Sequence, residues 1–186
     1  MLLLALLVAG CGPGAETPPQ PPAELATPAA IAESAPTRAS STEAFVARLT
    51  MTHRLETDAS RLARARARHT LVRAFAATTL REAEASGETL ARLAAAGGAP
   101  APSALDGPAR AALDTIRAAD AKSFDARYLD EIIEAREAAI DELERYAATG
   151  ADDSLRVWAA DALPMQRARL QEADTLRQSV NLDRPG

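Results

Sequence analysis

The sequence has too little cysteine to crosslink itself or to build a sulfur-ligated metal site. Only one of its 186 residues is cysteine. An intramolecular disulfide needs two cysteines and a cysteine-based metal cluster needs several, so both are excluded. The net charge of −5 is opposite in sign to the basic surface of a typical nucleic-acid-binding domain. We therefore expect no nucleic acid among the partners.

Aromatic residues are also scarce, at 3% of the chain, whereas alanine occurs 46 times. Alanine is the best helix former and is depleted in strands, so this composition favours helices. A charged fraction of 25% is typical of globular proteins, and the length suits a single domain.

The N-terminus begins with a short apolar run over residues 2–8. This run is far shorter than the roughly 20 residues that cross a bilayer, and small residues follow it, as in a secretory signal. The string Val8-Ala9-Gly10-Cys11 resembles the lipobox of bacterial lipoproteins. The resemblance implies cleavage after residue 10 and acylation of Cys11, where two or more acyl chains give a stable membrane anchor. The alternative is a buried cysteine at the end of an apolar helix.

The same resemblance implies where the protein resides. Gly12, and not aspartate, follows Cys11, and in lipoproteins this favours the outer membrane. We expect a lipid-anchored protein of the cell envelope that faces the periplasm.

Residues 12–39 contain seven of the twelve prolines. Proline fixes φ and lacks a backbone donor, so this stretch is predicted to be an extended spacer. The expected organisation is a signal peptide (1–10), a lipidated Cys11 with a proline-rich tether (11–39), a helical bundle (40–181) and a tail (182–186).

Helical periodicity begins where the prolines end. Ser40 and Glu43 have the spacing of a capping box, and Gly97-Gly98 suits a helix C-terminus. Long helices are predicted over residues 42–67, 70–96, 123–150 and from about 153 onward, and a short helix after Asp106. With no strand pattern, the sequence predicts an all-α four-helix bundle with a short extra helix between the second and third long helices.

The folded segment resembles the bacterial family called domain of unknown function 4142, whose fold is ferritin-like. The resemblance covers about 130 residues. It rests on Phe45-Val46, Glu56, Val72-Arg-Ala-Phe75-Ala, Leu93-Ala-Ala-Ala-Gly97, Phe124-Asp-Ala-Arg-Tyr128-Leu129-Asp130, Glu137 and Leu163-Pro164.

Members of that family often have inward-facing histidines, which together with the glutamate of the first helix suggest a metal cluster. The matching positions in this chain are Ala83, Arg136 and Arg169, beside Glu56. Alanine cannot bind a metal, and a permanently protonated guanidinium opposes a bound cation. The resemblance therefore implies a ferritin-like fold here without a metal centre, and we expect no cofactor.

Helical spacing places charges on the apolar stripes independently of the resemblance. Arg136 lies four residues after Ile132, Glu56 seven after Leu49, and Arg169 seven after Ala162. Because a buried charge persists only when it is paired, Glu56 is predicted to pair with Arg136, Arg169 or both. The alternative is that these long side chains extend to the edge of the bundle.

Two weaker patterns remain. His53 and Glu56 are three residues apart, a spacing used in carboxylate-bridged metal sites, although a helix-surface hydrogen bond explains it equally. The second pattern is a run of arginines near the end of the first long helix, which is either a solvated helix end or a contact for anionic lipids or envelope polymers. The run consists of Arg61, Arg64, Arg66, Arg68 and Arg73.

We interpret the chain as an exported lipoprotein whose bundle binds an envelope protein or a small ligand, or supports the envelope, without catalysis. The alternative is a ferritin-like metal-binding protein or oxidoreductase that uses His53 and the carboxylates of Glu56, Glu82, Glu134 and Glu137. A third possibility is a small-molecule sensor with a pocket near Pro164, where the last helix should bend.

Overall fold

The computed structural model describes residues 29–182. Within this range the chain is helical, without a strand. The prediction of an all-α bundle of four long helices, with a short helix between the second and the third, is confirmed. The helices are α1 (Ala29–Arg66), α2 (Thr70–Ala96), α3 (Gly107–Ala118), α4 (Phe124–Thr149) and α5 (Asp153–Leu182).

Helix ends follow the local chemistry of the sequence. The Asp106 side chain accepts a hydrogen bond from the Ala109 N–H at 2.9 Å, and Asp152 accepts one from Leu155 at 2.8 Å. Each carboxylate thus satisfies a free amide in the first turn of α3 or α5. At the end of α2, Gly98 has a φ of +75°, a left-handed conformation that glycine adopts without strain.

The start of α1 differs from the sequence prediction. The helix begins at Ala29, so Ser40 lies inside it instead of capping it, and residues 29–39 are helical instead of extended. Five of residues 29–35 are alanine or isoleucine, and their helix propensity outweighs the one proline, Pro36, that falls in this part of α1. The predicted signal peptide, Cys11 and the rest of the predicted tether lie outside the described residues.

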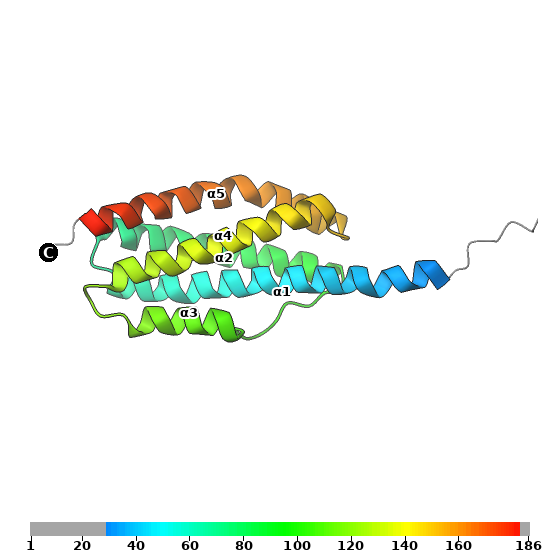
Figure 1. Ribbon diagram of the computed structural model, residues 1–186, viewed down its shortest axis with the longest axis horizontal. Coiled ribbons are helices and arrows are strands. Elements are labelled where there is room, and N and C mark those ends of the chain that lie inside the picture. The colour runs from blue at the N-terminus through cyan, green and yellow to red at the C-terminus, as the bar shows by residue number, and fades with distance from the viewer. Residues whose placement is uncertain (1–28, 183–186) are drawn as a thin grey trace, which may run out of the picture.

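The chain forms two helical hairpins that are joined by a long crossover. α1 packs against α2, α4 packs against α5, and α1 and α2 face α4 and α5 respectively. The backbone N–H groups of Arg68 and His69, in the α1–α2 turn, donate to the carboxylate of Asp125 in the first turn of α4. α2 and α4 therefore start at the same end, and α3 with its loops runs back along α1 to connect them (Figure 1).

Two clusters of apolar side chains fill the two halves of the bundle. The first, at the end near the α1–α2 turn, includes Phe75, Leu129 and Ile132, and the second includes Leu90 and Leu143. Each cluster contains a tyrosine whose hydroxyl is satisfied inside the bundle. Tyr128 pairs with Ser60 at 3.0 Å in the first cluster, and Tyr146 pairs with Thr42 at 2.9 Å in the second.

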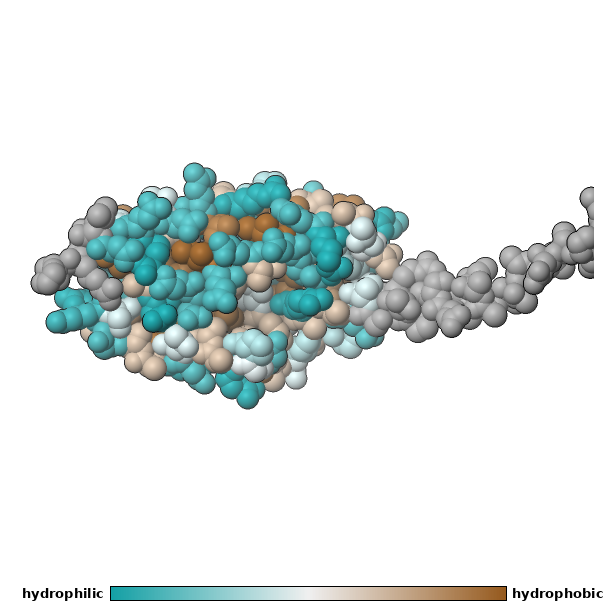
Figure 2. Space-filling view, viewed as in Figure 1, coloured by the Kyte–Doolittle hydropathy of each residue, from teal (hydrophilic) through white to brown (hydrophobic). Residues whose placement is uncertain are grey.

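The visible surface is mainly hydrophilic. In Figure 2 apolar residues show between charged side chains and form no continuous patch on this face. None of the described helices combines the length and the hydrophobicity needed to span a bilayer.

Candidate functional site

A layer of buried polar side chains lies between the two apolar clusters. On α2, α4 and α5 these side chains lie where the helix passes from one cluster to the other, and on α1 they lie next to Met51 and Leu55 of the first cluster. All of these side chains are at most 6% exposed, which is unusual for such polar groups. The layer consists of His53 and Glu56 on α1, Thr79 on α2, Arg136 on α4 and Gln166 on α5.

An ion pair between Glu56 and Arg136 forms the centre of this layer. The Arg136 Nε atom lies 3.0 Å from Glu56 Oε1, and the two side chains are 1% and 2% exposed. The N–H direction does not meet hydrogen-bond geometry, so the contact is an ionic one. Burial raises the pKa of Glu56, and the charge of Arg136 opposes that rise. The contact that helical spacing predicted between these two residues is present.

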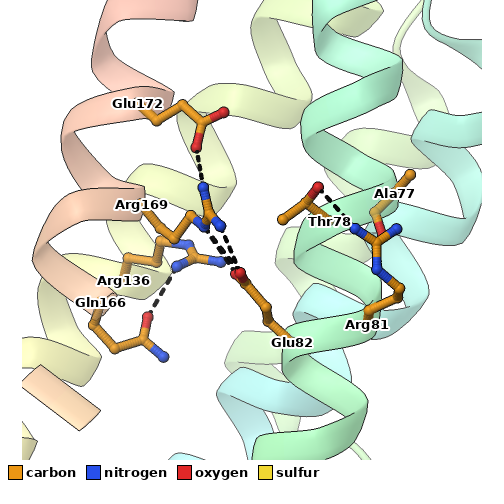
Figure 3. A network of polar contacts seen from close by, with 8 residues as sticks. All are labelled: Ala77, Thr78, Arg81, Glu82, Arg136, Gln166, Arg169 and Glu172. Atoms are coloured by element: carbon orange, nitrogen blue, oxygen red, sulfur yellow. Dashed lines mark hydrogen bonds and ion pairs between the residues drawn. The ribbon is translucent and has the colours of Figure 1, made fainter. Parts of the chain in front are cut away.

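Arg136 has a second buried partner. Its Nη1 atom donates a hydrogen bond of 2.9 Å to Oε1 of Gln166 (Figure 3). Gln166 was not predicted from the sequence, although the residue lies seven positions after Ala159 and seven before Ala173, which are both fully buried. This spacing on α5 was the available signal.

Arg169 does not join the buried pair: of the predicted pairings only that of Glu56 with Arg136 forms, and the placement of Arg169 in the same buried cluster is wrong. Its guanidinium instead holds Glu82 on α2 at 2.7 Å and Glu172 on α5 at 2.6 Å (Figure 3). Hydrogen bonds to both carboxylates raise the pKa of Arg169 further above its ordinary value. Its side chain is 31% exposed, because residues 162 and 169 flank the buried stripe of α5 and Gln166 takes the inward position.

His53 is buried without a hydrogen-bond partner for either ring nitrogen among the described residues. Burial, with a smaller contribution from the charge of Arg136, lowers its pKa to about 4, so the ring is neutral at physiological pH. Trp158 approaches the ring edge-on, with 6.3 Å between ring centroids. Gly87 leaves space next to His53, since a Cβ atom at residue 87 would lie 3.6 Å from the His53 Cβ.

These residues do not fit the metal cluster that a ferritin-like fold implies. The carboxylate of Glu56 faces a permanent cation, and Ala83 at the neighbouring buried position offers no donor atom. Glu82 is occupied by Arg169, while Glu134 and Glu137 lie on the exposed side of α4. Residues 29–182 contain no group of three or more His, Cys, Asp or Glu side chains arranged to hold a metal ion.

The run of arginines and the predicted pocket near Pro164 lie apart from the polar layer. Arg61 pairs with Asp58 and Glu84, and Arg66 and Arg73 donate to backbone carbonyls at helix ends. A cavity of about 320 Å³ lies between α2 and α5 beside Pro164, lined in part by Trp158, Ala162 and Met165.

A family model described as "Domain of unknown function (DUF4142)" matches residues 26–176, which is most of the chain. No curated protein and no solved structure matches it.

Proposed function

The chain belongs to the DUF4142 family, and we propose that it is an exported lipoprotein, acylated at Cys11, whose bundle has a binding or structural role in the cell envelope without catalysis. The observation that carries the non-catalytic part is the buried Glu56–Arg136 pair. It places a permanent positive charge at the centre of the bundle, where a ferritin-like enzyme would hold its metal. A second cation beside Arg136 would be repelled in a medium of low dielectric constant.

The lipobox-like string ending at Cys11 supports the anchor, and Gly12 supports an outer-membrane location on the periplasmic side. Acylation can be tested by metabolic labelling with palmitate and by membrane fractionation after a carbonate wash. The parent chain should incorporate label and stay with membranes, whereas Cys11→Ser should do neither. A Cys11→Ser chain that remains in the washed membranes would contradict the anchor.

The outer-membrane location has its own matched variant. Gly12→Asp keeps the acylated cysteine and changes only the residue next to it, so it should still be labelled but should move to the inner-membrane fraction. Identical fractionation of the parent and Gly12→Asp would contradict the proposed location.

The alternative function, a metalloprotein that uses His53 and carboxylates, can be tested directly. The full chain is purified without chelator, and its iron, manganese and zinc are measured next to those of a His53→Ala, Glu56→Ala variant. We expect substoichiometric metal in both proteins. Near-stoichiometric metal in the parent that is lost in the variant would establish the metalloprotein instead.

A further inference from the structure

A groove of about 250 Å³ opens where α3 lies against α1 and α4. Its floor is apolar and includes Leu49, Met51 and Leu55 of α1, all buried. The facing walls of α3 and α4 contribute alanines, among them Ala112 and Ala138. Because an alanine side chain is a single methyl group, these walls leave room for another apolar group.

The rim of this groove carries carboxylates that form no ion pair with a described cation. Asp106 at the start of α3 and Glu131 and Glu134 on α4 lie on the rim, and no described Arg, Lys or His side chain is within ion-pair distance of them. The one arginine of the rim, Arg48, lies 3.5 Å from the Glu142 carboxylate, which also pairs with Arg145. The rim therefore carries more carboxylates than positive charges.

The two glutamates of the rim also repel each other. They are three residues apart on α4, where side chains are neighbours. Partial burial raises the pKa of Glu131, the charge of Glu134 raises it further, and Arg127 opposes the rise. A positive charge placed beside these carboxylates would relieve the repulsion.

We propose that this groove binds a small organic cation with an apolar chain, the chain lying on Leu49, Met51 and Leu55 and the positive head lying beside Glu131 and Glu134. Charge complementarity favours this ligand class. An anionic amphiphile would be repelled by the carboxylates of the rim, and a neutral amphiphile would interact only with the apolar floor. The inference supplies a ligand class for the binding role proposed above, and it does not depend on acylation of Cys11.

Isothermal titration calorimetry on the full-length Cys11→Ser chain tests the proposal, because this chain lacks the predicted lipid acceptor. The probe is octyltrimethylammonium, and the comparison ligands are octyl sulfate, octyl glucoside and tetramethylammonium. We expect saturable binding of the probe at one site. Each comparison ligand lacks either the positive charge or the chain, and should bind at least about tenfold more weakly, as expected when one such contribution is lost.

Two pairs of variants locate the site. Glu131→Gln with Glu134→Gln removes two rim charges and should weaken the probe about tenfold, whereas Glu137→Gln with Asp141→Asn makes the same charge change outside the groove and should leave binding unchanged. Ala138→Leu fills the groove and should abolish binding, while Ala148→Leu, on the exposed side of the same helix, should not.

Other outcomes overturn the proposal. Equal affinity for cationic, anionic and neutral amphiphiles, equal losses in the two charge variants, or no saturable binding would each do so. A dimer of the parent in analytical ultracentrifugation that Ala138→Leu converts to a monomer would assign the groove to a second copy of the chain. None of these results bears on the labelling or metal tests, so the two proposals fail separately.

Discussion

At the scale of single residues, the energetics of the bundle centre depend on Arg136. Its guanidinium is 1% exposed, so it has lost its hydration and depends on Glu56 and Gln166 for compensation. The desolvation of a buried pair can cost as much as its attraction returns. The pair is therefore not a large net source of stability, but each partner is needed once the other is present.

Removal of one partner should be costly. Glu56→Ala leaves the charge of Arg136 buried and unpaired, which is expected to lower the free energy of unfolding by about 3–5 kcal/mol. Urea denaturation followed by circular dichroism measures this loss. The control is Glu144→Ala, which breaks the solvent-exposed pair with Arg167 and should cost less than about 1 kcal/mol. Similar losses in the two variants would contradict the buried-pair interpretation.

Replacement of both charged residues should lower the free energy of unfolding less than removal of one of them. In a chain with Glu56→Leu and Arg136→Met no unpaired charge remains buried, so this chain is expected to be more stable than Glu56→Ala alone. The same urea titrations provide the comparison. A double variant less stable than Glu56→Ala would show that the pair itself contributes strongly to the fold.

His53 predicts a pH dependence of stability. Its pKa is about 4 in the folded chain and 6.5 when unperturbed, so the unfolded state binds the proton more readily. Stability from this residue is complete above pH 6.5 and falls as the pH drops toward 4, by about 3 kcal/mol in total. The raised pKa of Glu56 acts in the opposite direction, because it favours proton uptake by the folded chain.

The contribution of His53 can be isolated with His53→Leu. Glu56 is present in both chains, so the difference in their unfolding free energies between pH 7 and pH 4 reports the histidine alone. Wild type should lose stability relative to His53→Leu as the pH falls. Parallel pH profiles would mean that His53 is not held neutral by burial.

At the scale of elements, two glycines at helix positions have opposite roles. A Cβ atom at Gly87, inside α2, would meet His53 at an ordinary distance of 3.6 Å. A Cβ atom at Gly150, just after α4, would fall within 2.6 Å of the Tyr146 carbonyl oxygen and equally close to its ring. At Gly87 there is room beside His53 for a methyl group. At Gly150 a Cβ atom would clash with Tyr146, whose ring stacks on Phe45 with 3.8 Å between centroids.

Alanine substitutions should therefore have opposite effects on stability. Gly87→Ala is expected to stabilise the chain by about 0.5–1 kcal/mol, because glycine is a poor helix former. Gly150→Ala is expected to destabilise it by about 1–3 kcal/mol through overpacking. Thermal and urea unfolding measure both changes. Destabilisation of the two variants to the same extent would contradict this account of α2.

At the scale of the whole molecule, the polar layer divides the core but not the helices. Each of α1, α2, α4 and α5 passes through both apolar clusters. Neither cluster can lose its packing without disordering helices that also build the other. The bundle is therefore expected to unfold as one unit.

Cooperative unfolding is open to a two-probe test. Trp158 is the single tryptophan of the chain and packs against the second cluster, so its fluorescence reports one half of the bundle. Circular dichroism reports all helices. The two urea transitions should coincide, as required of a two-state change. A fluorescence transition at clearly lower or higher urea than the circular dichroism transition would show that the halves unfold separately.

The fold was predictable because local rules and helical periodicity agree over most of the chain. Asp106, Asp152 and Gly97-Gly98 mark helix ends in the sequence and do so in the structure. The exception is the start of α1, where one capping pattern at Ser40 was outweighed by an alanine-rich stretch before it. At this point the capping pattern and the helix propensity of the preceding residues predict different helix starts, and the spacing of residues does not show which effect is larger.

The polar layer was only partly predictable. Helical periodicity predicted that Glu56 and Arg136 face the interior, because each repeats the spacing of apolar neighbours on its own helix, but the same spacing at Arg169 did not lead to burial. Only the tertiary structure decided which arginine pairs with Glu56. It also decided that Gln166 completes the polar layer. The rotation of α5 against α2 and α4 sets these contacts, and it results from the packing of all four helices, which no single helix's sequence encodes.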